Sequence, residues 1–571
     1  MYFLGWLAFF QMSFLPGFLL ISILKIRVRS IIEKIIFIFS LSLIINFILV
    51  FLLTLTKLYQ PVYCYVIFIS ELIIFLIVVK NQPLTVDIFL PKKSSFLYNL
   101  GAIVVEIVIF RFFLLFIQNL SLNSVFLTGD AIDSWNQWAI QWARNQIPKL
   151  TYHYPQLIPA NWSLTYVFMQ TTRVELFAKL LMPLFVLGIL LIFLDLYLQT
   201  KKTHFLFSLI ITGGLFHYYF DSSFLRDGYV DIAFAFFALL PFYAFQLYQK
   251  YKQIEYLFLI IIFSLGSILT KQLGALVILT VVPILWQPKR LTLAGNKRPR
   301  DYYFWLLIIG LLVIVILGWY LLKLPEIKTA INIFQLYRTA IMGKLTDLSI
   351  QSRLAQSIKL LTPNIKGIII VTVTVLLSLL SLVKKTPAQI FFFIILPFFL
   401  FWSFFLNYDQ RNLAVIFPYL GYTSAAGLEK ILVTKYTIRN KKARLSLSIP
   451  IIIFIIFIAI ASFFVNNNYL LQQQTEGKKQ IGIPELNSRL YEYYYKNGFS
   501  GKIATSYYRL CNLPEIGKYC LYSQRLSSVK IKQPGVEYLL YPKELLQPVK
   551  EERKIIFSFR GWVFSISNSE V

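Results

Sequence analysis

Long apolar runs recur from one end of the chain to the other, and they limit the possible folds more than any other feature. A run of about 18 or more apolar residues is long enough to cross a bilayer as a helix. The stretches 31–56, 62–79 and 174–198 are of this kind. Of the 571 residues, 58% are hydrophobic and only 14% are charged. We therefore predict an all-α membrane protein with about 14 transmembrane helices, because spanning segments must satisfy their own backbone hydrogen bonds.

The distribution of charge predicts how these spans are oriented. The formal net charge is +29, but the basic residues do not gather into the single patch that would indicate nucleic-acid binding. They lie in short linkers between spans, such as 25–30, 249–254, 288–301 and 430–446. When the spans are counted alternately, these linkers share one side, which the positive-inside rule identifies as cytoplasmic. We predict an integral protein of a bacterial plasma (inner) membrane with no nucleic-acid partner.

Three regions follow from this count. Residues 1–97 supply N-terminal transmembrane helices, and residues 98–465 form a second transmembrane region with an outer loop at 119–173. Residues 466–571 are polar and are expected to form a small α+β domain on the extracytoplasmic side. A further outer loop at 324–365 is unusually long, which suggests a role.

Several local features of these outer segments can be predicted. Alternating stretches at Tyr538–Tyr541 and Lys554–Phe559 indicate strands in the C-terminal domain. Cys511 and Cys520 lie in a compartment where a disulfide is permitted, and two free thiols are an equal alternative. The amphipathic segment Ile327–Leu345 is expected to lie on the surface as a helix.

The most informative polar stretch runs from residue 129 to residue 165, in the first outer loop. It holds two carboxylates, Asp130 and Asp133, and four of the ten Trp residues, which are Trp135, Trp138, Trp142 and Trp162. If 131–145 is helical, the first three indoles share one face, and Asp133 lies on another. We predict an interfacial helix with these indoles at the lipid boundary and Asp130 as the N-cap. Asp133 would then face a cavity, where one carboxylate can act as a general base.

Other charged residues are placed on the same outer side by the count. They are Asp221, Asp227, Asp231 and Asp409, with the cations Arg226, Lys271 and Arg411. Carboxylates near a membrane are expensive, so their convergence from separate loops predicts one functional site. The alternative is that each caps its own span, that Lys271 snorkels to the interface, and that Arg226 pairs locally with Asp227.

The order of the outer-loop motifs resembles the GT-C superfamily of membrane glycosyltransferases, and is similar to its protein mannosyltransferase and aminoarabinose transferase type. The resemblance covers roughly 98–430. The motifs are Asp133-Ser134-Trp135-Asn136-Gln137-Trp138-Ala139, Trp142-Ala143-Arg144, Tyr154-Pro155-Gln156-Leu157-Ile158-Pro159, Asp227-Gly228-Tyr229-Val230-Asp231, Thr270-Lys271-Gln272-Leu273-Gly274, and Arg411 before Pro418-Tyr419. The chain departs from the GT-C pattern in two ways. Four spans precede the acidic loop, and no second acidic residue directly follows the first.

The resemblance implies a GT-C-like catalytic domain over 98–465 and transfer of a sugar from a polyprenyl-phosphate-linked donor. The acceptor would be a hydroxyl of a glycan, lipid or protein on the extracytoplasmic face, and transfer would be inverting. Asp133 or Asp130 would be the base, Arg411, Lys271 and Arg226 would stabilise the phosphate, and Asp227, His153, Tyr154 and Gln156 would contact substrate. No cofactor is certain, the metal is unknown, and a divalent cation remains an option.

Two other functions compete with this interpretation. A polymerase or ligase of surface polysaccharide would rely on Arg and His in a late outer loop, whereas the acidic motif here is early. A lipid-linked sugar transporter or flippase would show inverted repeats and spans broken at corresponding positions, which the sequence lacks. Glu71, Glu106 and Arg111 are charges at mid-depth that keep the transporter as an alternative.

Overall fold

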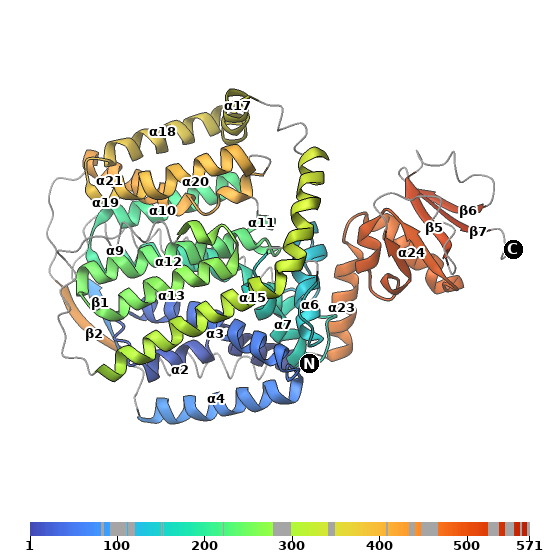
Figure 1. The fold of residues 1–571 in the computed structure, drawn as a ribbon, viewed down its shortest axis with the longest axis horizontal. Helices are drawn as coiled ribbons and strands as arrows, with labels where there is room; N and C mark the ends of the chain where they lie inside the picture. The colour runs from blue at the N-terminus through green and yellow to red at the C-terminus, as the bar shows by residue number, and fades with distance from the viewer. Residues whose placement is uncertain are drawn as a thin grey trace.

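The computed structural model describes a bundle of helices with a small separate domain at one end (Figure 1). The described residues are 1–81, 85–91, 111, 120–149, 151, 154–220, 222–277, 299–340, 349–406, 409–432, 440–446, 466–522, 536–542, 553–559 and 562–567. Seven helices, or eight if one bent pair counts as a single span, are long and apolar enough to cross a membrane within these ranges. The predicted helical fold is therefore confirmed, and these long apolar helices are consistent with a membrane protein.

The N-terminal helices form one side of the bundle. They are α1 (Tyr2–Ser13), α2 (Leu15–Ile23), α3 (Ile31–Leu55) and α4 (Pro61–Asn81). The expected first span is broken at Phe14, because Pro16 in the first turn of α2 cannot continue a regular helix. Ser30 begins α3 by accepting a hydrogen bond from the Glu33 amide, as an N-cap residue does.

The central helices contain the most deeply buried part of the core. They are η1 (Ala131–Trp135), α6 (Asn136–Ala143), α7 (Leu157–Met169), α8 (Leu176–Lys179), α9 (Met182–Thr200), α10 (Thr203–Tyr219), α11 (Ser222–Arg226), α12 (Val230–Tyr251) and α13 (Ile254–Thr270). Every residue of α7 is buried, although the sequence predicted an outer loop across 119–173. With 13 residues, α7 is too short to span a bilayer, so its apolar content was assigned to a loop.

The later helices complete the bundle. They are α15 (Pro299–Ala340), α17 (Ile350–Leu361), α18 (Ile365–Ser381), α19 (Lys385–Ile390), η3 (Phe391–Ile395), α20 (Leu396–Phe401), η4 (Trp402–Leu406), η5 (Gln410–Leu413) and α21 (Phe417–Leu432). The prediction of a separate surface helix at Ile327–Leu345 is wrong for residues 327–340, because α15 continues through Pro325 to Ala340. A proline inside a long helix bends it without ending it when the flanking turns persist. Further along the chain, α17 meets α18 at an angle of 105°.

Two β structures lie at opposite ends of the bundle (Figure 1). At one end β1 (Thr85–Pro91) and β2 (Asn440–Ser446) pair as an antiparallel ribbon. At the other end, α23 (Asn467–Lys479) and α24 (Pro484–Asn497) precede a five-stranded sheet in the order β4-β3-β5-β7-β6. Its strands are β3 (Lys502–Thr505), β4 (Cys520–Tyr522), β5 (Val536–Pro542), β6 (Arg553–Phe559) and β7 (Trp562–Ser567), with the short helices η6 (Tyr508–Asn512) and η7 (Gly517–Tyr519) between β3 and β4.

The sheet is mixed, and its two predicted strands are confirmed as β5 and β6. Strand β3 pairs in parallel with β4 and β5, whereas β7 pairs antiparallel with β5 and β6. Leu486 and Leu490 of α24 pack with Phe564 of β7 in a core that belongs to this domain alone. Cys511 and Cys520 form a disulfide, which decides between the two alternatives that the sequence left open.

Helix α23 attaches the C-terminal domain to the bundle. Lys478 pairs with Glu175 at 2.8 Å, and Gln474 accepts a hydrogen bond from the Glu175 amide at 2.9 Å. A Cβ on Gly477 would lie 2.1 Å from the Asn123 carbonyl oxygen, so only glycine permits this close approach. The domain is therefore held against the same loop that leads into η1.

Candidate functional site

The acidic helix, residues 131–143, buries a face that the sequence predicted to be exposed to lipid. Residues 131–143 are helical as expected, but the first turn is π-helical, a form that is frequent at functional sites. Trp135, Trp138 and Trp142 are buried in the protein, so their predicted place at the lipid boundary is wrong. Trp135 packs edge-on against Trp138, with ring centroids 4.9 Å apart, and Trp142 packs against Trp319. Apolar surface that the sequence assigned to lipid is covered by other helices instead.

Asp130 binds an arginine and does not cap the helix. Its φ of −58° and ψ of −39° are already helical, and its side chain makes no capping bond. Asp130 Oδ2 instead lies 2.7 Å from Arg411 Nη1, across 281 positions of sequence. The N-cap prediction is therefore wrong, because a remote cation offers the carboxylate a stronger partner than a backbone amide.

Arg411 is the centre of a cluster of polar groups from separate loops. Its Nε donates to Asp409 Oδ2 at 2.6 Å, and its guanidinium carbon lies 4.2 Å from the centroid of the Tyr229 ring. Burial alone would lower the pKa of Arg411, but the bonds to Asp409 and the charge of Asp130 raise it above its ordinary value. The guanidinium therefore stays charged under all ordinary conditions.

A second cation joins this cluster from the end of α13. Lys271 Nζ pairs with Asp231 Oδ1 and donates to Asn412 Oδ1 at 2.8 Å. Both side chains of the pair are nearly buried, at 10% and 12% exposure. The snorkelling alternative for Lys271 does not describe this arrangement, because its ammonium turns into the protein and meets a carboxylate. Asn412 directly follows Arg411, and the charge of Asp231 also acts on Arg411, so the two cations belong to one cluster.

Tyr154 lies beside the same cluster. Burial first, and then the charges of Asp231 and Asp130, raise the pKa of its phenol, while Gln272 and Arg411 act in the opposite direction. Its ring packs on Trp135 at 5.4 Å between centroids. The predicted convergence of charged residues is thus observed for Asp130, Asp231, Asp409, Lys271 and Arg411. Together with Tyr154 beside them, we call these residues the charged cluster.

Of the remaining predicted residues, one bonds to nearby protein groups, and two lie outside the described residues. Gln156 is buried, accepts from Trp142 Nε1 at 3.4 Å and donates to the Tyr154 carbonyl at 3.1 Å, so these contacts give it a structural role. His153 and Asp221 lie outside the described residues.

Asp227 is held in a buried ion pair that the sequence did not reveal. Lys179 Nζ lies 2.6 Å from Asp227 Oδ1, with 4% and 2% of the side chains exposed, and it donates to the Val125 carbonyl at 2.6 Å. Arg226 Nε is 3.7 Å from the same carboxylate oxygen, as the local-pair alternative expected. Gly228 follows with a φ of +94°, and a Cβ there would lie 2.8 Å from the Ala131 Cβ. This turn therefore packs directly under the acidic helix.

Replacing Lys179 by methionine is expected to destabilise the protein by about 3–5 kcal/mol, because Asp227 would stay buried and charged with only the more distant contact to Arg226 in compensation. The measurement is the thermal unfolding midpoint of the purified protein in detergent. The double variant Lys179→Met with Asp227→Leu should recover most of the loss, because it removes both charges. A single Lys179→Met variant as stable as wild type would contradict the assigned role of the pair.

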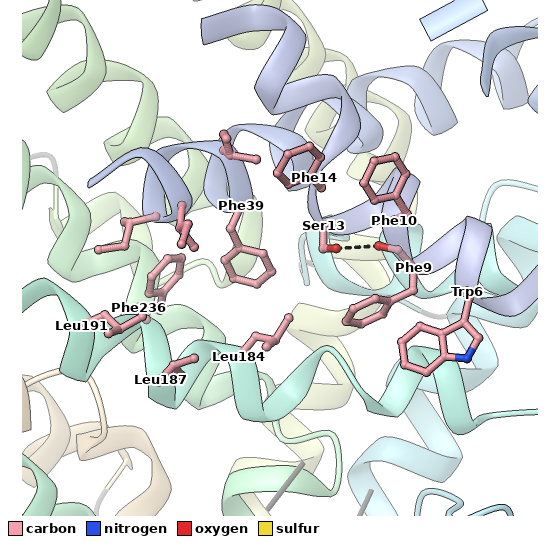
Figure 2. Close-up of a pocket in the computed structure, with 14 residues that line it drawn as sticks. Trp6, Phe9, Phe10, Ser13, Phe14, Phe39, Leu184, Leu187, Leu191 and Phe236 are labelled. Carbon is pink, nitrogen blue, oxygen red and sulfur yellow. Dashed lines mark hydrogen bonds between the residues drawn. The ribbon is translucent and has the colours of Figure 1, made fainter. Parts of the chain in front are cut away.

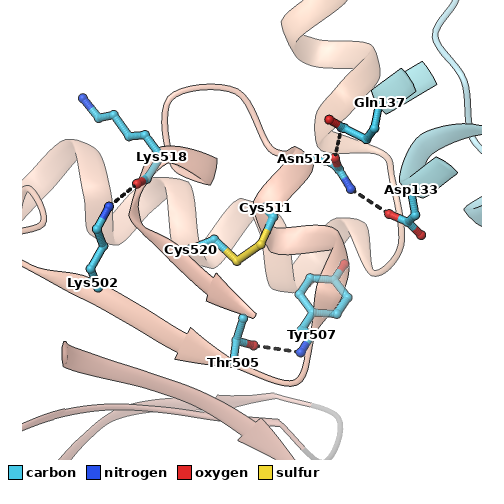
Figure 3. Close-up of a disulfide and its surroundings, with 9 residues drawn as sticks. All are labelled: Asp133, Gln137, Lys502, Thr505, Tyr507, Cys511, Asn512, Lys518 and Cys520. Carbon is cyan, nitrogen blue, oxygen red and sulfur yellow. Dashed lines mark hydrogen bonds between the residues drawn. A yellow bond between two sulfur atoms is a disulfide. The ribbon is translucent and has the colours of Figure 1, made fainter. Parts of the chain in front are cut away.

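Asp133 faces the C-terminal domain (Figure 3). Asn512 Nδ2 donates to Asp133 Oδ1 at 2.8 Å, and Gln137 Nε2 donates to Asn512 Oδ1 at 2.7 Å. Asp133 and Gln137 share one face of the helix, as their spacing predicted. Burial raises the pKa of the Asp133 carboxyl to about 6, against the opposing effects of Asn512 and Arg509, and Asp130 adds repulsion. A carboxylate with this pKa is ionised at neutral pH and basic enough to accept a proton.

An apolar cavity of about 240 Å³ lies between the N-terminal helices, α9 and α12, apart from these charges (Figure 2). Its lining includes Phe10 and Phe14 near the break between α1 and α2, Phe39 of α3 and Leu184 of α9. The Ser13 hydroxyl in its wall is bonded to the Phe9 carbonyl at 2.6 Å. The lining therefore suits a hydrocarbon chain better than a sugar or a phosphate.

Several residues of these sites were not found by sequence reasoning. Lys179, Lys323 and Asn512 each have a partner that is distant in sequence, so no local pattern marks them. Lys323 of α15 is buried, pairs with Glu326 at 2.8 Å, and donates to the Pro148 carbonyl. Glu326 in turn accepts from the Thr151 amide at 3.0 Å, which fixes the segment that leads to Tyr154.

Within the ranges given above, no group of three or more His, Cys, Asp or Glu side chains is arranged to hold a metal ion. Comparison with known proteins finds no family model that matches the chain and no curated protein with significant similarity to it. The GT-C resemblance therefore rests on the motifs alone.

Proposed function

We propose that the protein is a membrane glycosyltransferase that moves a sugar from a polyprenyl-phosphate-linked donor to an acceptor hydroxyl on the extracytoplasmic face. The observation that carries the proposal is the charged cluster, in which Arg411 and Lys271 are drawn together from two separate loops. Two cations in one cluster can bind a phosphate that leaves from a lipid, once the phosphate replaces part of their bonding to the carboxylates. A carboxylate one helical turn from Asp130 supplies the base that such a reaction needs.

The reaction would proceed as a single displacement. The acceptor oxygen forms a bond to the anomeric carbon, while the bond from that carbon to the phosphate oxygen breaks. Asp133 takes the acceptor proton, and the leaving phosphate carries its charge to Arg411 and Lys271. Asp130 and Asp409 hold the Arg411 guanidinium in place from two sides before the donor binds. Inversion at the anomeric carbon follows from a single displacement.

We also propose a GT-C-like architecture with about 14 spans, of which the described helices supply part. The apolar stretches 98–118, 273–287 and 447–465 lie wholly or largely outside the described residues and have the composition of further spans. The basic linkers would lie in the cytoplasm, and the charged cluster and the C-terminal domain on the opposite side.

Transfer can be tested in membranes that contain the full chain. The probes are polyprenyl-phosphate-linked hexoses and pentoses with a radiolabelled sugar, supplied with and without a chelator. The expected result is label in a new glycosidic product, absent from membranes with an Arg411→Ala/Lys271→Ala double variant. A transporter would move the label across the membrane without forming a product. If no donor of this class yields product with the wild-type chain, the proposed function is wrong.

A further inference from the structure

The C-terminal domain reaches the candidate base through one side chain. Asn512 stands at the end of η6, between Asp133 and Gln137 of the acidic helix (Figure 3). Its amide donates to Asp133 Oδ1 at 2.8 Å and accepts from Gln137 at 2.7 Å. An ionised carboxylate can only accept hydrogen bonds, so the NH₂ group of Asn512 must face Asp133 and its oxygen faces Gln137.

The loop that carries Asn512 is fixed to the sheet by the disulfide. Cys511 directly precedes Asn512, and Cys520 is the first residue of β4. Strand β4 pairs in parallel with β3, so the disulfide ties the η6 segment to the edge of the five-stranded sheet. Helix α23 holds the same domain against the loop before η1. The disulfide on one side and helix α23 on the other therefore fix the position of the Asn512 amide.

We propose that Asn512 is a positioning residue for Asp133, and that the disulfide-bonded loop exists to present its amide to that carboxylate. The inference rests on the proposed function, because Asp133 is the base of that reaction. Asn512 touches neither the donor nor the acceptor carbon and acts through Asp133. By donating to Oδ1, it fixes the rotamer of the carboxylate and leaves the second oxygen for the acceptor proton.

The charges around Asp133 determine what loss of this amide should do. Arg509, also on η6, stabilises the ionised form, whereas Asp130 opposes it. A hydrogen bond donated to a carboxylate favours the charged form, so removing it raises the pKa. The base must be ionised to work, and activity falls as the pH drops through its pKa. The acid limb of the pH profile should therefore move to higher pH by about one unit in Asn512→Leu.

The protonation of Asp133 can be followed without any substrate. A hydrophobic carbodiimide reacts with protonated carboxyl groups, and peptide mass spectrometry then reports the labelled fraction of Asp133 at each pH. In the purified full-length wild-type protein, labelling should fall with a midpoint near pH 6. Asn512→Leu should move the midpoint upward, Asn512→Asp should move it further because it adds a negative charge, and the Cys511→Ser/Cys520→Ser double variant should move it in the same direction.

The matched control is Asn497→Leu, because Asn497 is an exposed asparagine of the same domain that bonds only locally, to the Tyr493 carbonyl at 3.2 Å. It should leave both the midpoint and the pH profile of transfer unchanged. An unchanged midpoint in Asn512→Leu would overturn the positioning role, even if transfer is observed. If the midpoint shifts but the protein transfers no sugar, the positioning role of Asn512 is supported and only the proposed glycosyltransferase function is contradicted.

Discussion

Replacing Asp133 by asparagine should reduce sugar transfer by about 100- to 10,000-fold, which is the usual contribution of a general base. The amide keeps the size of the carboxylate but cannot accept the proton of the acceptor. The side-chain oxygen of the new asparagine can still accept the hydrogen bond from Asn512, so the contact between the domains is largely preserved. The measurement is the rate of transfer from the labelled donor, normalised to the amount of protein in the membrane.

Two controls separate the chemistry of Asp133 from general effects of charge. Glu492→Gln removes an exposed carboxylate from α24 and should leave the rate unchanged. Asp130→Asn should reduce transfer less than Asp133→Asn, because Asp130 holds Arg411 and Asp409 continues to do so. If Asp130→Asn alone abolishes transfer and Asp133→Asn does not, the base is Asp130 and the assignment made here is reversed.

The parts of the fold that the sequence predicted are those governed by local composition. Helices such as α3, α9 and α12 follow from long apolar runs, and β5 and β6 follow from alternation in a polar region. The spacing of Asp133 and Gln137 correctly predicted a shared helical face, because helical periodicity is a property of the chain itself.

What the sequence could not predict is what each face meets. The three indoles of the acidic helix share a face, but lipid and buried protein are equally apolar, so their composition does not distinguish the two. Helix α7 shows the same ambiguity, since its apolar run is too short for a span and was assigned to a loop. The interiors of membrane proteins and the bilayer select similar residues, and only the packing decides between them.

The candidate site was predicted in its composition but not in its pairings. Convergence of Asp231, Lys271 and Arg411 was expected from topology, because the count placed all three on one side. Their partners depend on distances between loops, so the Asp130–Arg411 pair replaced the expected N-cap. Asn512 lies 379 positions from Asp133, beyond the reach of any local motif.

Replacing Arg411 by alanine should lower transfer by about 100- to 1,000-fold, comparable to the loss of one preorganised group that stabilises developing charge. Charge grows on the phosphate oxygens as the bond to the sugar breaks, so the loss should appear in kcat as well as in KM. Arg411→Lys should recover only part of the rate, because an ammonium cannot contact Asp130, Asp409 and a phosphate with a planar fork.

The control for Arg411 is Arg173→Ala, which removes an exposed arginine that the charge count places on the same side. It should leave kcat unchanged, because Arg173 lies outside the charged cluster. Arg411→Ala also releases Asp130 and leaves Lys271 as the cation next to Asn412, so the remaining activity should depend more strongly on Lys271. Adding Lys271→Ala should then remove most of that activity, whereas a double variant no slower than Arg411→Ala would show that the two cations do not bind the same phosphate.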